Sequence, residues 1–389
     1  MGTRAGRPVG VGALGVFHLS SKSQPKTNDS ARFMERALRL AERGRGHVSP
    51  NPVVGAVVVR DGRVVGEGWH RALGQAHAEA VALSRAGRAA RGATLYVTLE
   101  PCAHVGRTPP CVDAILDAGI RRCVVATRDP HPIVDGRGLR RLRAAGVKVE
   151  LGLMAAESRA LLGGYWQVHT TGRPHVVLKL ATSLDGRLAP PAGFAPRGSG
   201  RWLTGPEARR AVHRLRSQVD AIVIGSGTAR ADDPRLTVRG IRGTRQPLRV
   251  VCDSRLALPS TLQLLRLPLS RGTLIACTNR APKAKERALL AKGVRVWRLP
   301  RGRGGVSLAA LLRRLAREGA QEVLVEGGSR LATSMLASGA VDQLALFVAP
   351  RVLGAEGLAW CGPLPASLEG RIRDQRRVGA DTWLTIEMR

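Results

Sequence analysis

The spacing of hydrophobic residues in the first half of the chain predicts a small α/β unit. Apolar residues at 34, 37, 38 and 41 recur at helical spacing, and Gly44 ends that helix. A strand at 53–59, the Asp61-Gly62 turn and a return strand at 63–68 form a hairpin. Further strands are expected at 93–98, 122–126 and 147–151, with helices from about 77 and 110 and a basic helix after 126. The first half is therefore a sheet with helices on its faces.

The second half repeats strand and helix patterns in alternation, which favours a mostly parallel sheet covered by helices. Strands are expected at 175–181, 221–225, 248–252, 322–326 and 343–349, and helices at 206–218, 283–292, 308–317 and 329–338. A stretch with Gly and Pro at 163–174 separates the two patterns. We therefore expect domains at 29–172 and 173–389. Residues 1–28 contain no acidic residue, and we expect them to form a basic tail outside the fold. Their composition suits a transit peptide, a disordered tail or an over-extended gene start.

The chain is strongly basic, with 62 Lys and Arg against 29 Asp and Glu and a formal charge of +33. Such a charge suits nucleic acid, a membrane surface or anionic small molecules. The basic residues are spread along the chain, aromatic residues make up 3%, and no apolar run reaches the roughly 20 residues of a membrane span. We therefore expect a phosphate-bearing small substrate, no nucleic acid and no membrane. Six cysteines without scaffold spacing indicate a reducing compartment, here the cytoplasm.

The strongest chemical signal is His77-Ala78-Glu79, followed by Pro101-Cys102 and Cys111. One imidazole and two thiolates suit Zn²⁺, and three protein ligands leave the fourth position open for water. Glu79 is placed to move a proton from that water to a leaving amine, provided that the pair lies where a helix begins. The alternatives are an exposed His-x-Glu pair, two buried cysteines, or a structural zinc site that His70 or His104 completes. The order of the elements favours a zinc-dependent deaminase.

Several stretches of the first half resemble the cytidine-deaminase superfamily. They are Ser49-Pro50-Asn51-Pro52-Val53-Val54-Gly55, Gly66-Glu67-Gly68-Trp69-His70, His77-Ala78-Glu79 and Thr98-Leu99-Glu100-Pro101-Cys102. The long Gly-Arg-Thr-Pro-Pro insertion before Cys111 resembles the riboflavin-biosynthesis deaminase, whereas editors of nucleic acid carry a short Pro-Cys-x-x-Cys form. The resemblance implies that His77, Cys102 and Cys111 hold zinc and that Glu79 is the catalytic proton shuttle. It also implies that Asn51, His70 and His104 line the pocket, although each could be an ordinary polar group near a loop.

Two glycine-containing turns in the second half follow predicted strands. Gly225-Ser226-Gly227-Thr228 and Gly327-Gly328-Ser329 each leave main-chain donors free for a phosphate. The second half has no Gly-x-Gly-x-x-Gly fingerprint, so these turns equally suit plain strand-to-helix connections.

This half resembles the reductase domain of the same bifunctional riboflavin-biosynthesis family. The resemblance rests on residues 178–186, 224–228, 231–239 and 325–329. It implies a dihydrofolate-reductase-like α/β domain after a cytidine-deaminase-like three-layer α/β/α domain, and NADPH as cofactor. The implied cofactor-binding residues are Thr182, Trp202, Thr228, Asp232, Ser254 and Gly328. The implied substrate-binding residues are Gly200, Arg216, Leu236, Arg239 and Glu326.

Ordinary structural roles stay open for some of these residues. Arg216 and Arg239 could be solvated, Trp202 could be core and Asp232 could be a cap. Gly200 departs from the family, which has a serine there, while this chain has Ser199 one position earlier.

The expected function is hydrolytic deamination of 2,5-diamino-6-(5-phospho-ribosylamino)pyrimidin-4-one, followed by NADPH-dependent reduction of its ribosyl group to ribityl. We expect a homo-oligomer. Two alternatives are a tRNA-directed base deaminase, suggested by the charge, and a deaminase whose reductase-like domain is inactive, suggested by Gly200.

Overall fold

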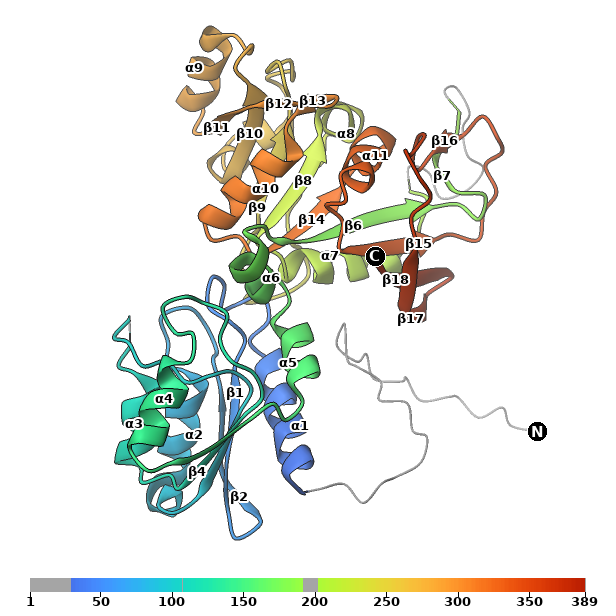
Figure 1. The fold of residues 1–389 in the computed structure, drawn as a ribbon. Coiled ribbons are helices and arrows are strands. Elements are labelled where there is room, and N and C mark those ends of the chain that lie inside the picture. The colour runs from blue at the N-terminus through green and yellow to red at the C-terminus, as the bar shows by residue number, and fades with distance from the viewer. Residues whose placement is uncertain (1–28, 107, 192–201, 389) are drawn as a thin grey trace, which may run out of the picture.

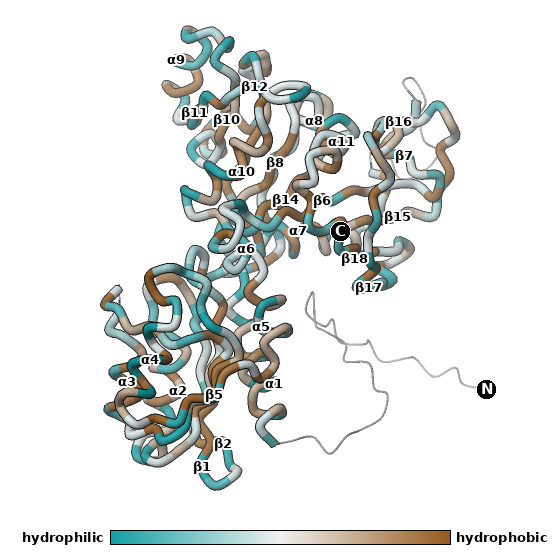
Figure 2. The backbone as a smooth tube through the Cα atoms, in the orientation of Figure 1, coloured by the Kyte–Doolittle hydropathy of each residue, from teal (hydrophilic) through white to brown (hydrophobic). Residues whose placement is uncertain are grey.

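The protein folds around two large sheets, as a computed structural model of residues 29–106, 108–191 and 202–388 shows (Figure 1). The basic tail and Gly200 lie outside the described residues. Hydrophobic residues run along strands of both sheets, whereas the tip of the first hairpin is hydrophilic (Figure 2). Each sheet thus has a core of its own.

The first sheet has five strands in the order β2-β1-β3-β4-β5. β1 is antiparallel to both of its neighbours, and β3, β4 and β5 are parallel. The strands are β1 (Gly55–Arg60), β2 (Arg63–Trp69), β3 (Thr94–Val97), β4 (Arg122–Val125) and β5 (Lys148–Leu151). The helices are α1 (Asp29–Glu42), α2 (Ala78–Ala86), α3 (Cys111–Asp117), α4 (Arg137–Ala144) and α5 (Ala155–Leu162), with a short η1 (Gly87–Ala90).

Helices cover both faces of this sheet. Val58 of β1 packs with α2, α3 and α4, while its neighbour Val57 packs with α1. Successive residues of a strand point to opposite faces, so a strand covered on both sides is hydrophobic throughout. Five of the six residues of β1 are buried for this reason. The three-layer α/β/α arrangement follows.

The second sheet has nine strands in the order β11-β10-β9-β8-β14-β6-β15-β18-β17. The strands from β11 to β15 in this order run parallel, and β18 and β17 add antiparallel partners at one edge. They are β6 (His175–Thr182), β8 (Ala221–Gly225), β9 (Leu248–Cys252), β10 (Thr273–Thr278), β11 (Arg295–Leu299), β14 (Glu322–Glu326), β15 (Gln343–Val348), β17 (Gly370–Val378) and β18 (Asp381–Met388).

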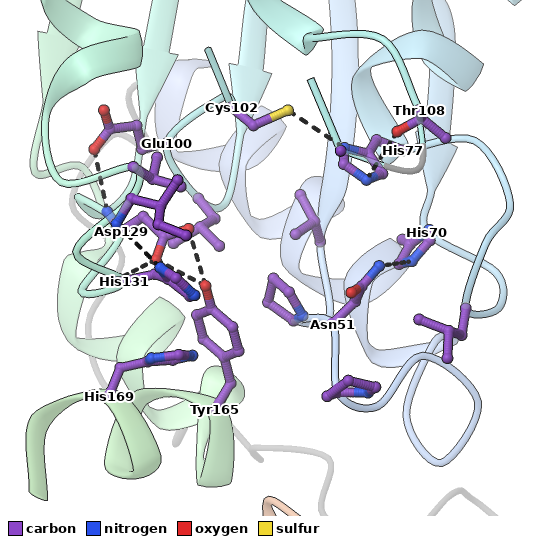
Figure 3. A pocket seen from close by; sticks show the side chains of 18 of the residues that line it. Asn51, His70, His77, Glu100, Cys102, Thr108, Asp129, His131, Tyr165 and His169 are labelled. Carbon is purple, nitrogen blue, oxygen red and sulfur yellow. Dashed lines mark hydrogen bonds between the residues drawn. The ribbon is translucent and has the colours of Figure 1, made fainter. Parts of the chain in front are cut away.

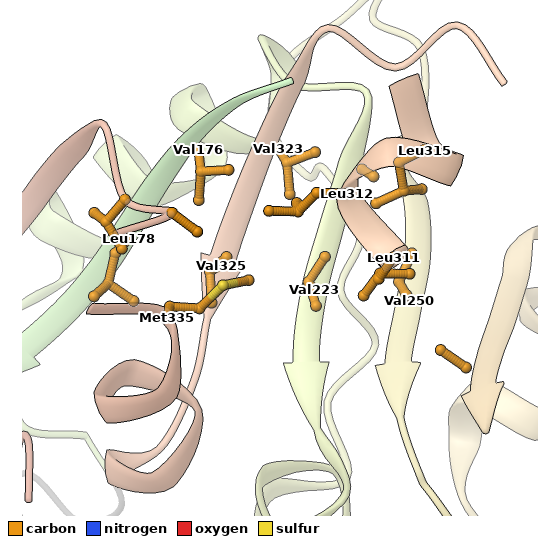
Figure 4. Packing of buried hydrophobic residues seen from close by; sticks show 14 of the residues in the cluster. Val176, Leu178, Val223, Val250, Leu311, Leu312, Leu315, Val323, Val325 and Met335 are labelled. Carbon is orange, nitrogen blue, oxygen red and sulfur yellow. The ribbon is translucent and has the colours of Figure 1, made fainter. Parts of the chain in front are cut away.

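Helices also cover both faces of the second sheet. α10 (Leu308–Arg317) and α11 (Ser329–Ala337) pack on one face, where Leu312 and Met335 meet Val223 and Val325 (Figure 4). α7 (Pro206–Ser217) and α8 (Ser226–Asp232) pack on the other face. The remaining elements are α9 (Lys283–Ala291), η2 (Gln263–Leu265), η3 (Leu269–Gly272), and the short strands β7 (Arg187–Ala189), β12 (Arg301–Gly302), β13 (Gly305–Val306) and β16 (Leu358–Ala359).

The structure contains strands that the sequence pattern did not predict. β10 and β11 extend the parallel sheet, and the hairpin of β17 and β18 closes its other end. β17 is an edge strand whose residues are mostly exposed, so its sequence Gly-Arg-Ile-Arg-Asp-Gln-Arg-Arg-Val lacks a hydrophobic face. The interval 163–174 also differs from a plain linker, because it holds α6 (Gly164–Thr171), which lies between the two sheets in Figure 1.

Among the described residues, the helices are all too short or too polar to cross a lipid bilayer.

Candidate functional site

A cavity of about 450 Å³ has the residues around His77 and Cys102 on one side and Tyr165 and His169 of α6 on the other (Figure 3). His77, Glu79 and Cys102 line one side of it, and Gly319 and Gln321 from the second half of the chain line another. The cavity therefore lies at the junction of the two sheets, and segments far apart in the sequence form its wall.

Three side chains from different elements converge at this cavity. Nδ1 of His77 lies 3.2 Å from Sγ of Cys111 and 3.7 Å from Sγ of Cys102. Ligand atoms at zinc–nitrogen and zinc–sulfur distances of about 2.0–2.3 Å stand roughly 3.5 Å apart in a tetrahedral site. The three ligand atoms all lie within 4.8 Å of one another. Their spacing and their chemistry fit a zinc ion with one open position.

The local structure explains how a His-x-Glu pair can face one site. His77 caps the N-terminus of α2 with extended backbone angles, φ −69° and ψ 162°, so it is not yet in the helix. Glu79 lies in the first turn and is 3% exposed. Burial raises the pKa of Glu79 to about 7, and its carboxyl contacts the Cys111 thiol. The carboxyl group is thus desolvated beside the three ligands.

The main-chain N–H and the thiol of Cys111 both hydrogen-bond to the sulfur of Cys102, which favours the thiolate form of Cys102. Cys111 is the first residue of α3, and its main-chain N–H donates to Sγ of Cys102 at 3.4 Å. The hydrogen bond with the Cys111 thiol lowers the pKa of Cys102 to about 4, while the same bond raises the pKa of Cys111. A thiolate is the form that binds metal, so Cys102 is a ready ligand at neutral pH.

Asn51 and His70 form a second polar pair in the cavity. Nδ1 of His70 donates to the carbonyl oxygen of Ala76 at 3.1 Å, which leaves Nε2 to accept from the Asn51 amide at 3.0 Å. Burial lowers the pKa of His70, so its ring is neutral. Since the Asn51 nitrogen is the donor, its side-chain oxygen keeps its acceptor capacity. His104 also lines the cavity.

A cluster on the opposite wall was not found from the sequence. The Tyr165 hydroxyl lies 2.9 and 3.1 Å from the two carboxylate oxygens of Asp129, and the His131 and His169 rings lie 4.3 Å apart (Figure 3). Burial raises the pKa of Asp129 to about 6 and lowers the pKa of His169 to about 4. The Asp129-Pro130-His131-Pro132 run in the loop after β4 was an available signal. Tyr165 and His169 come from α6, and no local pattern marks them.

The predicted cofactor turns of the second half lie side by side. β8 and β14 are neighbours, and the main-chain N–H of Gly328 donates to the Thr228 hydroxyl at 3.0 Å. Thr182 ends β6 and Ser254 follows β9, so these residues lie at the carboxyl edge of the parallel strands. Ligands of open α/β sheets bind at this edge. Asp232 is the last residue of α8.

Trp202 and the predicted substrate residues are placed as follows. Trp202 is 52% exposed beneath the Arg209 guanidinium, so it is not a core residue. Arg216 donates to both carboxylate oxygens of Glu326, at 2.6 and 2.8 Å, and its side chain is 12% exposed. Arg216 is therefore not a solvated surface residue.

The remaining substrate residues lie close to this ion pair. Leu236 is buried, with a positive φ of 50°. Arg239 is exposed, and its guanidinium lies 3.4 Å from Nε2 of His213. Lys179, for which the motifs predicted no chemical role, lies near the charges of Glu326 and Arg216, and burial lowers its pKa.

Two family models match the chain. The "cytidine and deoxycytidylate deaminase zinc-binding region" matches residues 27–127, and the "RibD C-terminal domain" matches residues 174–384. The chain is 42% identical over 327 residues to the riboflavin biosynthesis protein RibD of Aquifex aeolicus, covering 84% of this chain and 88% of that one. It is 40% identical over 371 residues to RibD of Escherichia coli, covering 91% and 98%.

Solved structures are similar over both sheets. RibD of Acinetobacter baumannii superposes with a TM-score of 0.83 at 35% identity, covering 93% of this chain and 99% of that chain. A diaminohydroxyphosphoribosylaminopyrimidine deaminase/5-amino-6-(5-phosphoribosylamino)uracil reductase from Thermotoga maritima superposes with a TM-score of 0.78 at 32% identity, with the same coverage.

Proposed function

The chain belongs to the RibD family of riboflavin biosynthesis proteins, and from that premise we propose the substrate and the site residues of each of its two reactions. It is a bifunctional deaminase and reductase. The sequence-based predictions of this family, of its function and of the fold class are confirmed. A match over both halves of the relatives favours this function over a tRNA deaminase. The alternative of an inactive second domain is tested by the reaction with NADPH.

The proposed first substrate is 2,5-diamino-6-(5-phospho-ribosylamino)pyrimidin-4-one, which loses an amino group by hydrolysis. The carrying observation is the convergence of His77, Cys102 and Cys111 beside a buried carboxyl group. These three residues would hold a zinc ion, which when bound supplies a polarised water of near-neutral pKa. Glu79 would accept a proton from the attacking water and deliver it to the departing amine. Asn51 and His70 would hold the pyrimidine ring through the remaining amide oxygen of Asn51.

The proposed second reaction reduces the ribosyl group to ribityl with NADPH, which carries the hydride chemistry. Support comes from the Thr228 hydroxyl and the Gly328 main-chain N–H, which lie at one edge of the sheet. The space beside Gly227 is open, because a Cβ added there would have no atom within 4 Å. We propose that the nucleotide contacts Thr182, Trp202, Thr228, Asp232, Ser254 and Gly328. The substrate contacts would be Gly200, Arg216, Leu236, Arg239 and Glu326.

Mass spectrometry of the full chain with the diaminopyrimidine substrate tests both reactions. Without NADPH, the product should show replacement of one amino group by oxygen. With NADPH, two further hydrogens should appear. No mass change without NADPH would refute the first assignment, and deamination without subsequent reduction would refute the second.

We further propose that domains at 29–172 and 173–389 carry the two reactions, and that the enzyme acts in the cytoplasm as a homo-oligomer. All six cysteines are free thiols, which suits a reducing compartment. The edge strand β17 exposes Ile372 at 57%, and an unpaired strand edge is a natural surface for a second copy. Light scattering of the purified protein tests this assembly, and a monomeric mass would contradict it.

A further inference from the structure

Gln321 belongs to the second half of the chain but lines the cavity of the first. It precedes β14, where its main-chain N–H donates to the Asp220 carboxylate at 2.7 Å. Its carbonyl accepts from the main-chain N–H of His175 at 2.8 Å. The residue is 8% exposed. Residues at the start of β6 and just before β8 thus hold the backbone of Gln321 in place, so the position of its Cα is fixed.

The side chain of Gln321 crosses the junction of the two domains. Its amide nitrogen donates a hydrogen bond to the main-chain carbonyl of Pro50. The adjacent Ser49 hydroxyl donates to the carbonyl of Gly319 at 3.5 Å, and a Cβ at Gly319 would lie 3.6 Å from the Pro50 ring. The loop between α1 and β1 therefore rests on the turn between α10 and β14.

This loop carries one of the polar groups of the deaminase cavity. Asn51 follows Pro50 directly and donates to Nε2 of His70. His70 in turn donates to the carbonyl of Ala76, the residue before His77, and the two imidazole rings lie 5.3 Å apart (Figure 3). A short series of contacts thus leads from the reductase domain to the substrate-facing wall of the deaminase site.

We propose that Gln321 is a positioning residue for deamination, acting through Pro50 to hold Asn51 against the pyrimidine substrate. The inference rests on the proposed deaminase function. A solvent-exposed amide could donate to water instead, but the nearly buried Gln321 amide has few acceptors besides the carbonyl of Pro50. Losing this donor frees the loop to move away from the cavity, while the zinc ligands and Glu79 keep their own supports in α2, α3 and the loop after β3.

The test compares Gln321→Met, which keeps the length of the side chain but removes the donor, with the wild-type full chain. KM for deamination should rise about tenfold, with kcat changed less than threefold, because the loop contributes to substrate binding and the loss is about that of one hydrogen bond. Zinc content and the rate of NADPH oxidation with the deaminated substrate should stay at wild-type values. Gln263→Met, which removes an amide bonded to Asp233 in the reductase domain, is the matched control and should leave deamination unchanged.

Two results would overturn the proposal. One is a KM within twofold of wild type. The other is a rise in KM accompanied by loss of zinc or of reductase activity, which would reveal a general structural role. If Gln321→Met does not fold, Gln321→Asn, which keeps the amide on a shorter stem, is judged by the same KM criterion. Absence of deamination in the wild-type chain would instead refute the proposed function, so the two failures are distinguishable.

Discussion

The carboxylate of Glu100 accepts a hydrogen bond from the main-chain N–H of Gly138 at 3.0 Å and so joins the loop that leads to Cys102 to the start of α4. Its oxygens also accept from the N–H groups of Asp129, Gly136 and Leu139. A Cβ at Gly138 would lie 1.9 Å from the carbonyl oxygen of Pro101, which leaves no room for a side chain. Glu100 therefore fixes the segment before the metal ligand while it satisfies four buried main-chain donors.

Replacement of Glu100 by alanine should lower the free energy of unfolding by about 2–4 kcal/mol, because buried N–H groups lose their acceptor. Glu100→Gln keeps one acceptor oxygen and should cost less. Urea denaturation of both variants measures the difference. Equal losses for the two variants would contradict the role given to the carboxylate.

Zinc content should depend on Cys102 and Cys111 but not on every cysteine. Cys102→Ser and Cys111→Ser should each lose stoichiometric zinc and deamination, while NADPH oxidation with the deaminated substrate persists. Cys361→Ser is the control, since this thiol lies in the second half and outside the metal cluster. Metal analysis by mass spectrometry checks the prediction. Retention of zinc by both ligand variants would show that the metal is held elsewhere.

Glu79→Gln should separate proton transfer from metal binding. The amide matches the shape of the carboxyl group but cannot exchange a proton, so kcat for deamination should fall by about 10²–10⁴. Zinc content should be unchanged. Steady-state kinetics together with metal analysis measure both effects. A variant with more than one-tenth of the wild-type kcat would rule out the proton-shuttle role.

Arg239 should contribute to binding of the phosphorylated substrate in the reductase half. Its guanidinium lies 3.4 Å from Nε2 of His213, and partial burial together with the charges of Arg216 and Arg235 lowers its pKa. A bound phosphate would relieve the repulsion among these positive charges. Arg239→Ala should raise KM for reduction about tenfold. Arg242→Ala, an exposed arginine of the same loop, is the matched control. Equal effects of the two variants would point to general electrostatics.

Stability should fall as the pH rises through neutrality because of His175 and Glu322, which lie 2.9 Å apart at the domain junction. Burial opposes the charge on the imidazole, but the Glu322 carboxylate, helped by Asp342 and opposed by Arg45, raises the pKa of His175. Because the pKa of His175 is higher in the folded state, its protonation stabilises the fold fully at pH values below the unfolded pKa of about 6.5. This contribution is lost as the pH rises through the folded pKa. The urea midpoint should therefore decrease from pH 6 to pH 8.

Glu322 sets the acidic limit of the same pair. Burial again opposes its charge, but His175 and Arg45 lower the pKa of Glu322, so its contribution is lost as the pH falls through that lowered value. In His175→Asn, the change in midpoint between pH 6 and pH 8 should be smaller than in the wild type. An unchanged pH dependence in this variant would assign the effect to other groups.

The sequence by itself determined the donor types of the candidate metal site and the positions of most strands in the two large sheets, but not the order of those strands. The metal ligands His77, Cys102 and Cys111 are recognisable because a zinc site needs fixed donor types. Glu79 is recognisable because it lies two residues from one of these ligands. Strands such as β8 and β14 are hydrophobic on both faces, so they stand out from their surroundings. β17 escaped detection because an edge strand buries little and needs no such pattern.

Only the tertiary structure decided what surrounds the metal ligands. Tyr165 and His169 reach the cavity because α6 packs at the junction, and Gln321 reaches Pro50 from the position just before β14 of the other sheet. Their side chains carry no local periodicity or motif, since their partners lie far away in the sequence. Contacts of this kind depend on how two finished domains dock, and that docking is set by packing between surfaces rather than by the order of residues within either one.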